Sequence, residues 1–83
     1  MRLLYFAWLR TKIGRAEEKI ELPAGIDTVA GLIDWLAARS PAHGAALANR
    51  ALVRVAVNQE YVGLGHRLQA DDEVALFPPM TGG

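Results

Sequence analysis

The first ten residues form an apolar run that predicts a β-strand. The run is rich in aromatic and aliphatic side chains and is shorter than a typical helix. Alternation along such a strand would divide these side chains between two faces, with Leu3, Tyr5, Ala7 and Leu9 on one and Leu4, Phe6 and Trp8 on the other. A strand that is apolar on both faces is usually central in its sheet, as parallel strands are. We therefore expect residues 1–10 to form an inner strand.

A second strand is predicted to follow a short turn. Residues 11–16 include Gly14 and have the composition of a turn. In the next segment, residues 17–22, charged side chains alternate with apolar ones: Glu17, Lys19 and Glu21 against Ile20 and Leu22. The first two strands are therefore expected to form a hairpin.

The clearest helical signal begins after Asp27 and Thr28, either of which can cap a helix N-terminus. Four apolar side chains then recur at the spacing i, i+3, i+4 and i+7: Val29, Leu32, Ile33 and Leu36. Pro41 disfavours helical geometry at Ser40, so the helix is expected to end before this pair. This segment is predicted to be the main helix.

The second half of the chain has the pattern of further strands. Val53, Val55 and Val57 alternate with polar or small residues, which predicts a strand over residues 51–57. A short strand is expected around Tyr61 and Val62, and a last one over residues 73–77. The alanine-rich residues 42–50 favour at most one short helical turn, and the pattern does not decide their secondary structure. This order of elements predicts an α+β fold in which one main helix packs on one face of a mixed sheet of four to five strands.

Composition narrows the functional classes. The chain has 83 residues, enough for one domain, and its nine Lys and Arg balance its nine Asp and Glu, which argues against a nucleic-acid binder. With no cysteine, the chain cannot form a disulfide or a thiolate metal site, and its two histidines, His43 and His66, do not have a metal-ligand spacing. We therefore expect no metal site. Because no apolar stretch approaches the roughly 20 residues that span a bilayer, we expect a soluble, cytoplasmic protein.

The last six residues carry the strongest chemical signal: Pro78, Pro79, Met80, Thr81, Gly82 and Gly83. Two prolines favour an extended chain, so we expect a folded domain over residues 1–77 and an extended tail over residues 78–83. Such a tail reaches at most roughly 20 Å, and its terminal glycines have no Cβ to block a narrow channel. The alternative is a frayed terminus without a role.

The whole pattern resembles the ubiquitin-like sulfur carriers of the β-grasp fold, most closely the small subunits of molybdopterin synthase, the MoaD family. The resemblance spans nearly the whole chain. Its residues are Phe6-Ala7, Leu9-Arg10, Gly14, Leu22-Pro23, Thr28-Val29, Leu32, Leu36, Ala56-Val57-Asn58-Gln59 and the block from Asp72 to Gly83. Asp71 stands where the family tends to have Gly, and Met80 where Val is common; neither departure affects the diglycine end.

This resemblance implies that the chain carries sulfur and is not an enzyme on its own. In the family, an E1-like enzyme uses ATP and Mg to adenylate the C-terminal carboxylate, here that of Gly83, and a sulfur donor converts it to a thiocarboxylate. The large synthase subunit, expected in a heterotetramer, then uses the sulfur for the molybdopterin dithiolene. No cofactor, nucleic acid or membrane is expected to bind this chain. Three alternatives stay open: a carrier for thiamine synthesis or tRNA thiolation, a protein modifier conjugated through Gly83, and an interaction domain with an inert tail.

An apolar surface on the first strand is the expected partner-binding site. If the main helix covers the face of Tyr5, then Leu4, Phe6 and Trp8 need another cover, and exposed apolar patches often mark interfaces. We expect this face, together with Arg10, Phe77 and the tail, to contact the large subunit and the activating enzyme in turn. The alternative is that loops of the chain itself cover it.

Overall fold

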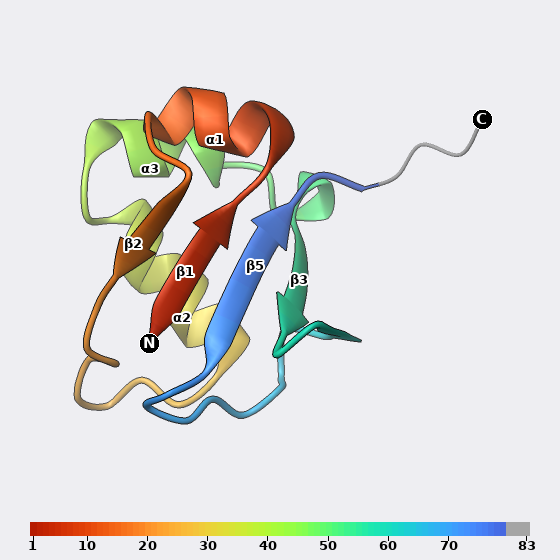
Figure 1. The fold of residues 1–83 in the computed structure, drawn as a ribbon. Coiled ribbons are helices and arrows are strands. Elements are labelled where there is room, and N and C mark those ends of the chain that lie inside the picture. The colour runs from red at the N-terminus through yellow and green to blue at the C-terminus, as the bar shows by residue number, and fades with distance from the viewer. Residues whose placement is uncertain (80–83) are drawn as a thin grey trace.

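The computed structural model of the chain describes residues 1–79. Its elements in chain order are β1 (Arg2–Tyr5), α1 (Ala7–Ile13), β2 (Glu17–Lys19), α2 (Val29–Ala37), α3 (Pro41–Ala46), the 3-10 turn η1 (Arg50–Leu52), β3 (Arg54–Val57), β4 (Glu60–Val62) and β5 (Glu73–Phe77). They form two layers, with the sheet in front of α2 in the view of Figure 1.

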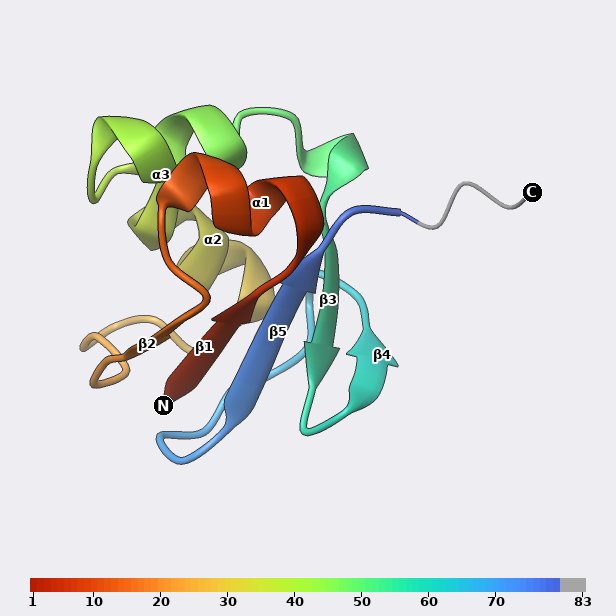
Figure 2. The ribbon, with the colours of Figure 1, turned by 45° about the horizontal axis from the view of Figure 1, so that its top comes forward.

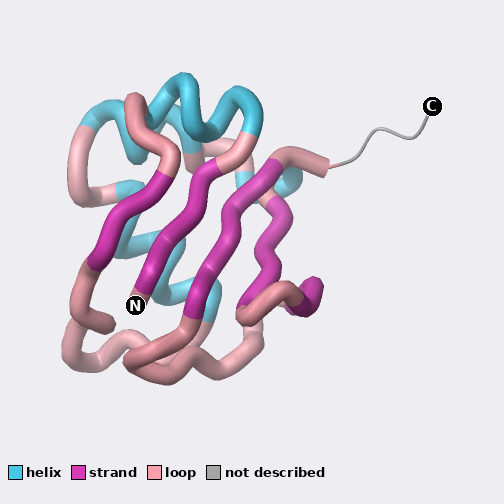
Figure 3. The backbone as a smooth tube through the Cα atoms, in the orientation of Figure 1, coloured by secondary structure: helices cyan, strands magenta, loops and turns pink. Residues whose placement is uncertain are grey.

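The five strands form one mixed sheet in the order β2-β1-β5-β3-β4. The first and last strands of the described chain, β1 and β5, lie side by side in parallel, with Leu3 opposite Val74. The pairs β1–β2, β3–β5 and β3–β4 are antiparallel. Figure 3 shows the strands as neighbouring tubes with β5 in the middle. The predicted mixed sheet is therefore confirmed.

The core lies between the sheet and α2. Residues of β1, β3 and β5 that point toward α2 are buried, among them Leu3, Val55 and Leu76. The helix contributes the apolar stripe expected from its spacing: Val29, Leu32, Ile33 and Leu36, each with no exposed surface. Figure 2 shows α2 behind the sheet and α1 and α3 at the end where β1 and β5 finish, and none of the helices along residues 1–79 covers the opposite sheet face.

The prediction of a strand over residues 1–10 is wrong beyond Tyr5. After Phe6 the chain turns into α1, whose buried side chains Leu9 and Ile13 are four residues apart and therefore lie on one side of the helix. The turn is made by Ala7, which has a left-handed backbone with φ of 55°. Glycine is the usual residue for such a conformation, so Ala7 carries no sequence signal for the turn.

Other boundaries also differ from the prediction. Strand β2 ends at Lys19, and because α1 separates it from β1, the two strands pair antiparallel as expected but do not form a simple hairpin. Residues 41–50 contain the short helix α3, whose first turn is capped by the Ser40 hydroxyl, and the start of η1. The turn at η1 moves the start of β3 to Arg54, whereas β5 has the predicted bounds.

Two further points concern the limits of the described chain. Its helices and strands fall within residues 2–77, so the predicted division between a domain and a tail at residue 78 stays a prediction. None of the helices along residues 1–79 is long and apolar enough to cross a membrane.

The cap of α2 makes a testable contribution to stability. The Thr28 hydroxyl accepts a hydrogen bond from the Gly31 amide at 3.2 Å. Substitution Thr28→Ala leaves that amide without its partner and should lower the free energy of unfolding by about 1 kcal/mol, measured by urea denaturation. Thr28→Ser keeps the hydroxyl and should stay close to wild type. Equal stabilities for the Ala and wild-type proteins would contradict a role for this cap.

Candidate functional site

The base of the tail is held in the middle of the sheet. Strand β5 lies between β1 and β3, and the Phe6 amide donates a hydrogen bond to the Leu76 carbonyl at 3.1 Å. Pro78 and Pro79 follow as half-buried residues, and the chain leaves the domain at the end of β5 (Figure 1). The predicted tail residues Met80, Thr81, Gly82 and Gly83 lie outside the described residues, so their predicted roles stay predictions.

The sheet face opposite α2 is apolar at the end where the tail begins. Alternation places Leu4 of β1, Ala75 and Phe77 of β5, and Ala56 and Tyr61 of β3 and β4 on this face, because their neighbours along each strand point toward the core. Phe6 has an extended backbone, with φ of −123° and ψ of 155°, and continues the alternation of β1 onto the same face. We call Leu4, Phe6, Ala56, Tyr61, Ala75 and Phe77 the open-face patch.

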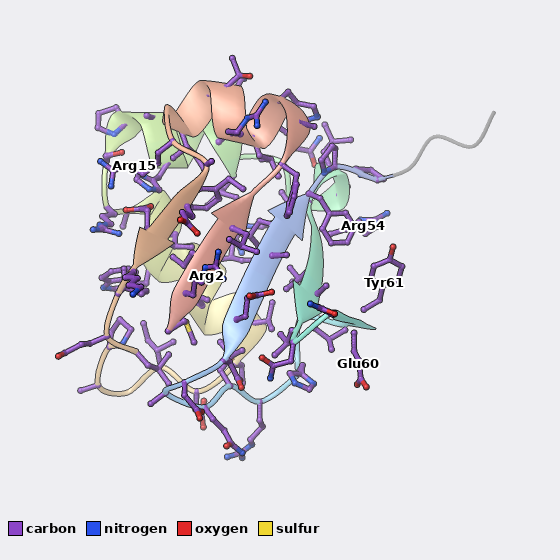
Figure 4. The ribbon with its side chains drawn as sticks, viewed as in Figure 1. Arg2, Arg15, Arg54, Glu60 and Tyr61 are labelled. Atoms are coloured by element: carbon purple, nitrogen blue, oxygen red, sulfur yellow. The ribbon has the colours of Figure 1, made fainter. Side chains whose placement is uncertain are left out.

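Two aromatic rings form the exposed end of the patch. The centroids of Tyr61 and Phe77 lie 5.5 Å apart with a tilted ring geometry, and Tyr61 is 82% exposed. Together with Arg54, Val55 and Val62 they line a surface hollow of about 250 Å³. Figure 4 shows Arg54 and Tyr61 on the side of the sheet where the tail leaves. So exposed an aromatic side chain is a candidate contact for another protein.

The other end of the same sheet face is ionic. Arg2 lies across the strands between Glu17 and Glu73 and forms ion pairs with both, at 2.8 and 3.3 Å. Arg2 and Glu17 are about half exposed and Glu73 is partly buried, so solvent screens these pairs and they add little to stability. Their effect is to bound the open-face patch with charge on the side away from the tail.

The structure brings together only part of the predicted partner-binding set. Leu4, Phe6 and Phe77 share the open face, as shown above. Trp8 and Arg10 instead lie on α1, so the strand alternation that grouped Trp8 with Leu4 and Phe6 does not extend to it. The predicted role of these two residues in partner binding stays a prediction. Phe6 and Trp8 are 48% and 36% exposed, so no loop of the described chain covers them fully.

Sequence reasoning missed Tyr61 as a functional candidate. Its strand, β4, has only three residues and gives a weak alternation signal. The pairing of β4 with β3 identifies it. Tyr61 lies opposite Ala56, and so small a cross-strand neighbour leaves the large aromatic ring exposed.

Comparisons with known proteins place the chain in a family. The profile of the ThiS family matches residues 3–83, nearly the full length. A protein of Escherichia coli (strain K12) named molybdopterin synthase sulfur carrier subunit is 40% identical over 83 residues, which cover 100% of this chain and 99% of that protein. This chain belongs to the ThiS family.

Further ThiS-family similarities extend over whole chains. A molybdopterin synthase sulfur carrier subunit of Chlamydomonas reinhardtii is 38% identical and covers 100% of this chain and 98% of its own. The solved structure of a putative molybdopterin converting factor, subunit 1, from Pyrococcus furiosus has a TM-score of 0.78 at 34% identity, with 95% of each chain covered. The solved structure of small archaeal modifier protein 1 of Haloferax volcanii has a TM-score of 0.75 at 31% identity, and the match covers 96% of this chain and 97% of that chain. The predicted β-grasp fold is confirmed.

A second cluster of polar side chains in this ThiS-family domain is buried at the β2 edge. Glu18 of β2 points into the core, opposite Leu3, and its Oε2 accepts hydrogen bonds from the Tyr5 hydroxyl at 2.6 Å and from His43 Nε2 at 2.8 Å. The other imidazole nitrogen, Nδ1, lies 2.6 Å from the Ser40 hydroxyl. Ser40, His43 and Glu18 thus have the connectivity of a catalytic triad.

The Ser40 hydroxyl has a structural use that argues against nucleophilic chemistry. It accepts a hydrogen bond from the His43 amide at 3.1 Å and so caps α3. An oxygen held in this way by the backbone of its own turn is poorly placed to attack a substrate. Among residues 1–79, no group of three or more His, Cys, Asp or Glu side chains is placed to hold a metal ion either. The cluster is therefore part of the fold.

Electrostatics in this cluster favour an ionised Glu18. Burial alone would raise the pKa of this carboxyl, but hydrogen bonds from Tyr5 and His43 and the charge of Arg39 outweigh burial and hold the pKa below its ordinary value. Burial, and then the hydrogen bond to the carboxylate, raises the pKa of Tyr5 well above its ordinary value. Tyr5 is therefore a permanent donor and Glu18 a permanent acceptor at neutral pH.

The lowered pKa predicts how stability depends on pH. A group whose pKa is lower in the folded than in the unfolded state stabilises the fold above its unfolded pKa, about 4.3 for Glu, and loses that contribution as the pH falls through the folded value. The difference in free energy of unfolding between wild type and Glu18→Gln should therefore be present above about pH 5 and shrink below about pH 4. Urea denaturation across this range measures it.

The matched control is Glu17→Gln, which removes an exposed carboxylate from the same strand. The free energy of unfolding of this variant should differ little from that of wild type at every pH tested. A Glu18→Gln difference that grew as the pH fell below 4 would contradict the lowered pKa.

Proposed function

We propose that this chain is a sulfur carrier, the small subunit of a molybdopterin synthase that acts in molybdenum cofactor biosynthesis. The observation that carries the proposal is that proteins named molybdopterin synthase sulfur carrier subunit match the chain from end to end, at 33–40% identity in several organisms. The diglycine end, Gly82-Gly83, is the chemistry that a sulfur carrier needs. We expect the protein to act in the cytoplasm.

The proposed reactive group is the carboxylate of Gly83. A terminal carboxyl has a pKa of about 3.3 to 3.7, so it is ionised at neutral pH and can attack the α-phosphorus of ATP, which releases pyrophosphate and leaves an acyl-adenylate. A sulfur donor then displaces AMP to give the thiocarboxylate. ATP and Mg belong to an E1-like activating enzyme in this scheme, and the chain binds no cofactor of its own.

The catalytic residues of the synthase are proposed to lie on the large subunit, in a heterotetramer with two copies of each chain. The open-face patch is the proposed contact for that subunit and for the activating enzyme in turn, with Trp8 and Arg10 of α1, the helix that follows Phe6, as further proposed contacts. Three features support this assignment: the patch adjoins the base of the tail, its apolar side chains include exposed Phe6 and Tyr61, and charge around Arg2 bounds its far end. An interface of this kind has an apolar centre and a polar rim.

A second candidate function is protein modification through Gly83. It is favoured by the structural similarity to small archaeal modifier protein 1 of Haloferax volcanii. A modifier would use the same adenylated terminus but would transfer its acyl group to a lysine amine, forming an isopeptide bond and releasing AMP. Lysine-linked adducts recovered from cells would distinguish this function from sulfur transfer.

A carrier for thiamine synthesis or tRNA thiolation would share the thiocarboxylate and differ only in the acceptor.

The terminal chemistry can be tested by mass spectrometry. The chain is incubated with a cognate activating enzyme, ATP and a sulfur donor, and then with an alkylating reagent. Because the chain has no cysteine, we expect the label on Gly83, where the thiocarboxylate is the strongest nucleophile. Fragmentation is required, since exchange of oxygen for sulfur adds nearly the same mass as oxidation of Met1 or Met80.

A chain that lacks Gly83 is the matched control and should remain unlabelled. If the full chain also remains unlabelled, while the same activating enzyme converts another carrier, the sulfur-carrier proposal is wrong. Deletion of Gly82 and Gly83 without effect on pterin synthesis would support an inert tail instead.

The open-face patch can be tested by substitution. Phe6→Ser should weaken binding to the large subunit at least about tenfold, measured by calorimetry, because truncation of a central aromatic contact commonly costs 2 kcal/mol or more. Leu64→Ser is the control: Leu64 is 45% exposed, close to the 48% of Phe6, but follows β4 outside the patch. If both variants bind like wild type and are folded, the partner does not use this surface.

A further inference from the structure

Glu18 is the meeting point of four segments that are distant in the sequence. Besides Tyr5 of β1 and His43 of α3, two arginines reach its other oxygen, Oε1: Arg39, after α2, at 2.9 Å and Arg15, after α1, at 3.3 Å. The carboxylate itself is almost fully buried, with 3% of its side chain exposed. The Arg15 and Arg39 side chains remain partly exposed, so the cluster lies where the core meets the surface.

Helix α3 has few other means of holding its place. It has six residues, too few for a stable isolated helix, so its stability must come from tertiary contacts. Its apolar contribution to the core is small, chiefly Ala46 and the following Leu47. Its fit against α2 is close: a Cβ on Gly44 would lie 2.9 Å from the Ala37 carbonyl oxygen. His43 joins it to the sheet, through its bond to Glu18 of β2 and the edge-on packing of its ring against Tyr5 of β1, with ring centroids 6.2 Å apart.

Helix α1 depends on the same cluster. It has seven residues, lacks a side-chain N-cap, and packs against α3. Both of its ends adjoin ligands of Glu18, because Tyr5 lies two residues before its start and Arg15 two residues after its end. Figure 4 shows Arg15 at the side of the domain away from Tyr61 and Arg54. Arg15 thus lies on the opposite side of the domain from the Tyr61 end of the open-face patch.

We propose that Glu18 is an ionic latch that fixes α1 and α3 to the β1–β2 edge, and that these two helices open as one unit when its charge is removed. The half of the domain formed by β3, β5 and α2 keeps its structure in this open form, because its core pairs, such as Val55 with Leu76 and Val57 with Val74, join two strands that contribute no donor to Glu18. Sub-global opening of this type is a general property of domains whose contacts are unevenly distributed. The proposal concerns the fold and stands or falls independently of sulfur transfer.

Amide hydrogen exchange at neutral pH tests the latch. In Glu18→Gln, which keeps the size of the side chain but removes its charge, amides of residues 9–13 and 43–47 should exchange at least about tenfold faster than in wild type. Amides of residues 55–57 and 74–76 should change much less. Glu17→Gln, which removes an exposed charge from the adjacent position, should leave both sets unchanged.

Two further variants keep the test decisive. Tyr5→Phe removes one hydrogen bond to Glu18 and should accelerate the same amides to a smaller extent, so it replaces Glu18→Gln if that variant does not fold. Gly44→Ala displaces α3 from Ala37 while Glu18 is intact, and should accelerate exchange in α1 as well as in α3 if the two helices open together. Uniform acceleration in both halves of the domain, acceleration of α3 without α1, or no acceleration in the latch variants would overturn the proposal.

Discussion

The parallel pairing of β1 with β5 is the constraint on which the rest of the structure depends. Parallel neighbours cannot be joined by a tight turn, so the chain must cross over between them, and here α2 and α3 lie within that crossover. Helix α2 consequently lies on one side of the sheet, and the other side keeps an uncovered apolar patch. The same pairing places the end of β5, where the tail begins, beside Phe6. One backbone constraint thus brings the end of β5 and the proposed docking surface together.

The parts of the fold that could be predicted from the sequence are those with a local cause. Helix α2 was predicted from the i, i+3, i+4, i+7 spacing of four apolar residues: Val29, Leu32, Ile33 and Leu36. Strand β5 was predicted with the correct bounds because a turn precedes it and two prolines follow it. Helix α1 could not be predicted, because its short apolar stripe of Leu9 and Ile13 is embedded in a longer apolar run. The signal for its start was hidden, since Ala7 adopts a conformation that usually requires glycine. These residues become helical because tertiary contacts outweigh local preference.

The candidate site divides in the same way. The tail is a prediction that rests on composition alone, because Pro78-Pro79 and Gly82-Gly83 have local conformational preferences. Leu4, Phe6 and Phe77 were identified correctly as residues of one surface, but Tyr61 joins them only through the pairing of β4 with β3. The sequence pattern could not identify Glu18 as a buried residue. Its carboxylate is buried together with hydrogen-bond donors such as Tyr5 and His43, which are far from it in the sequence and show no periodic spacing.

The distance in sequence between β1 and β5 has a consequence for how the chain folds. Contacts between segments from opposite ends of the described chain raise the contact order, and high contact order slows folding because a long loop must be closed before its contacts stabilise anything. During synthesis, Leu3 and Tyr5 cannot reach their native neighbours on β5 until residues 73–77 have left the ribosome. The edge of β1 that pairs with β5 therefore stays unpaired until then. The pairing of β5 and the completion of the core arise in the same folding step, so a half-folded chain does not hold the end of β5 beside Phe6.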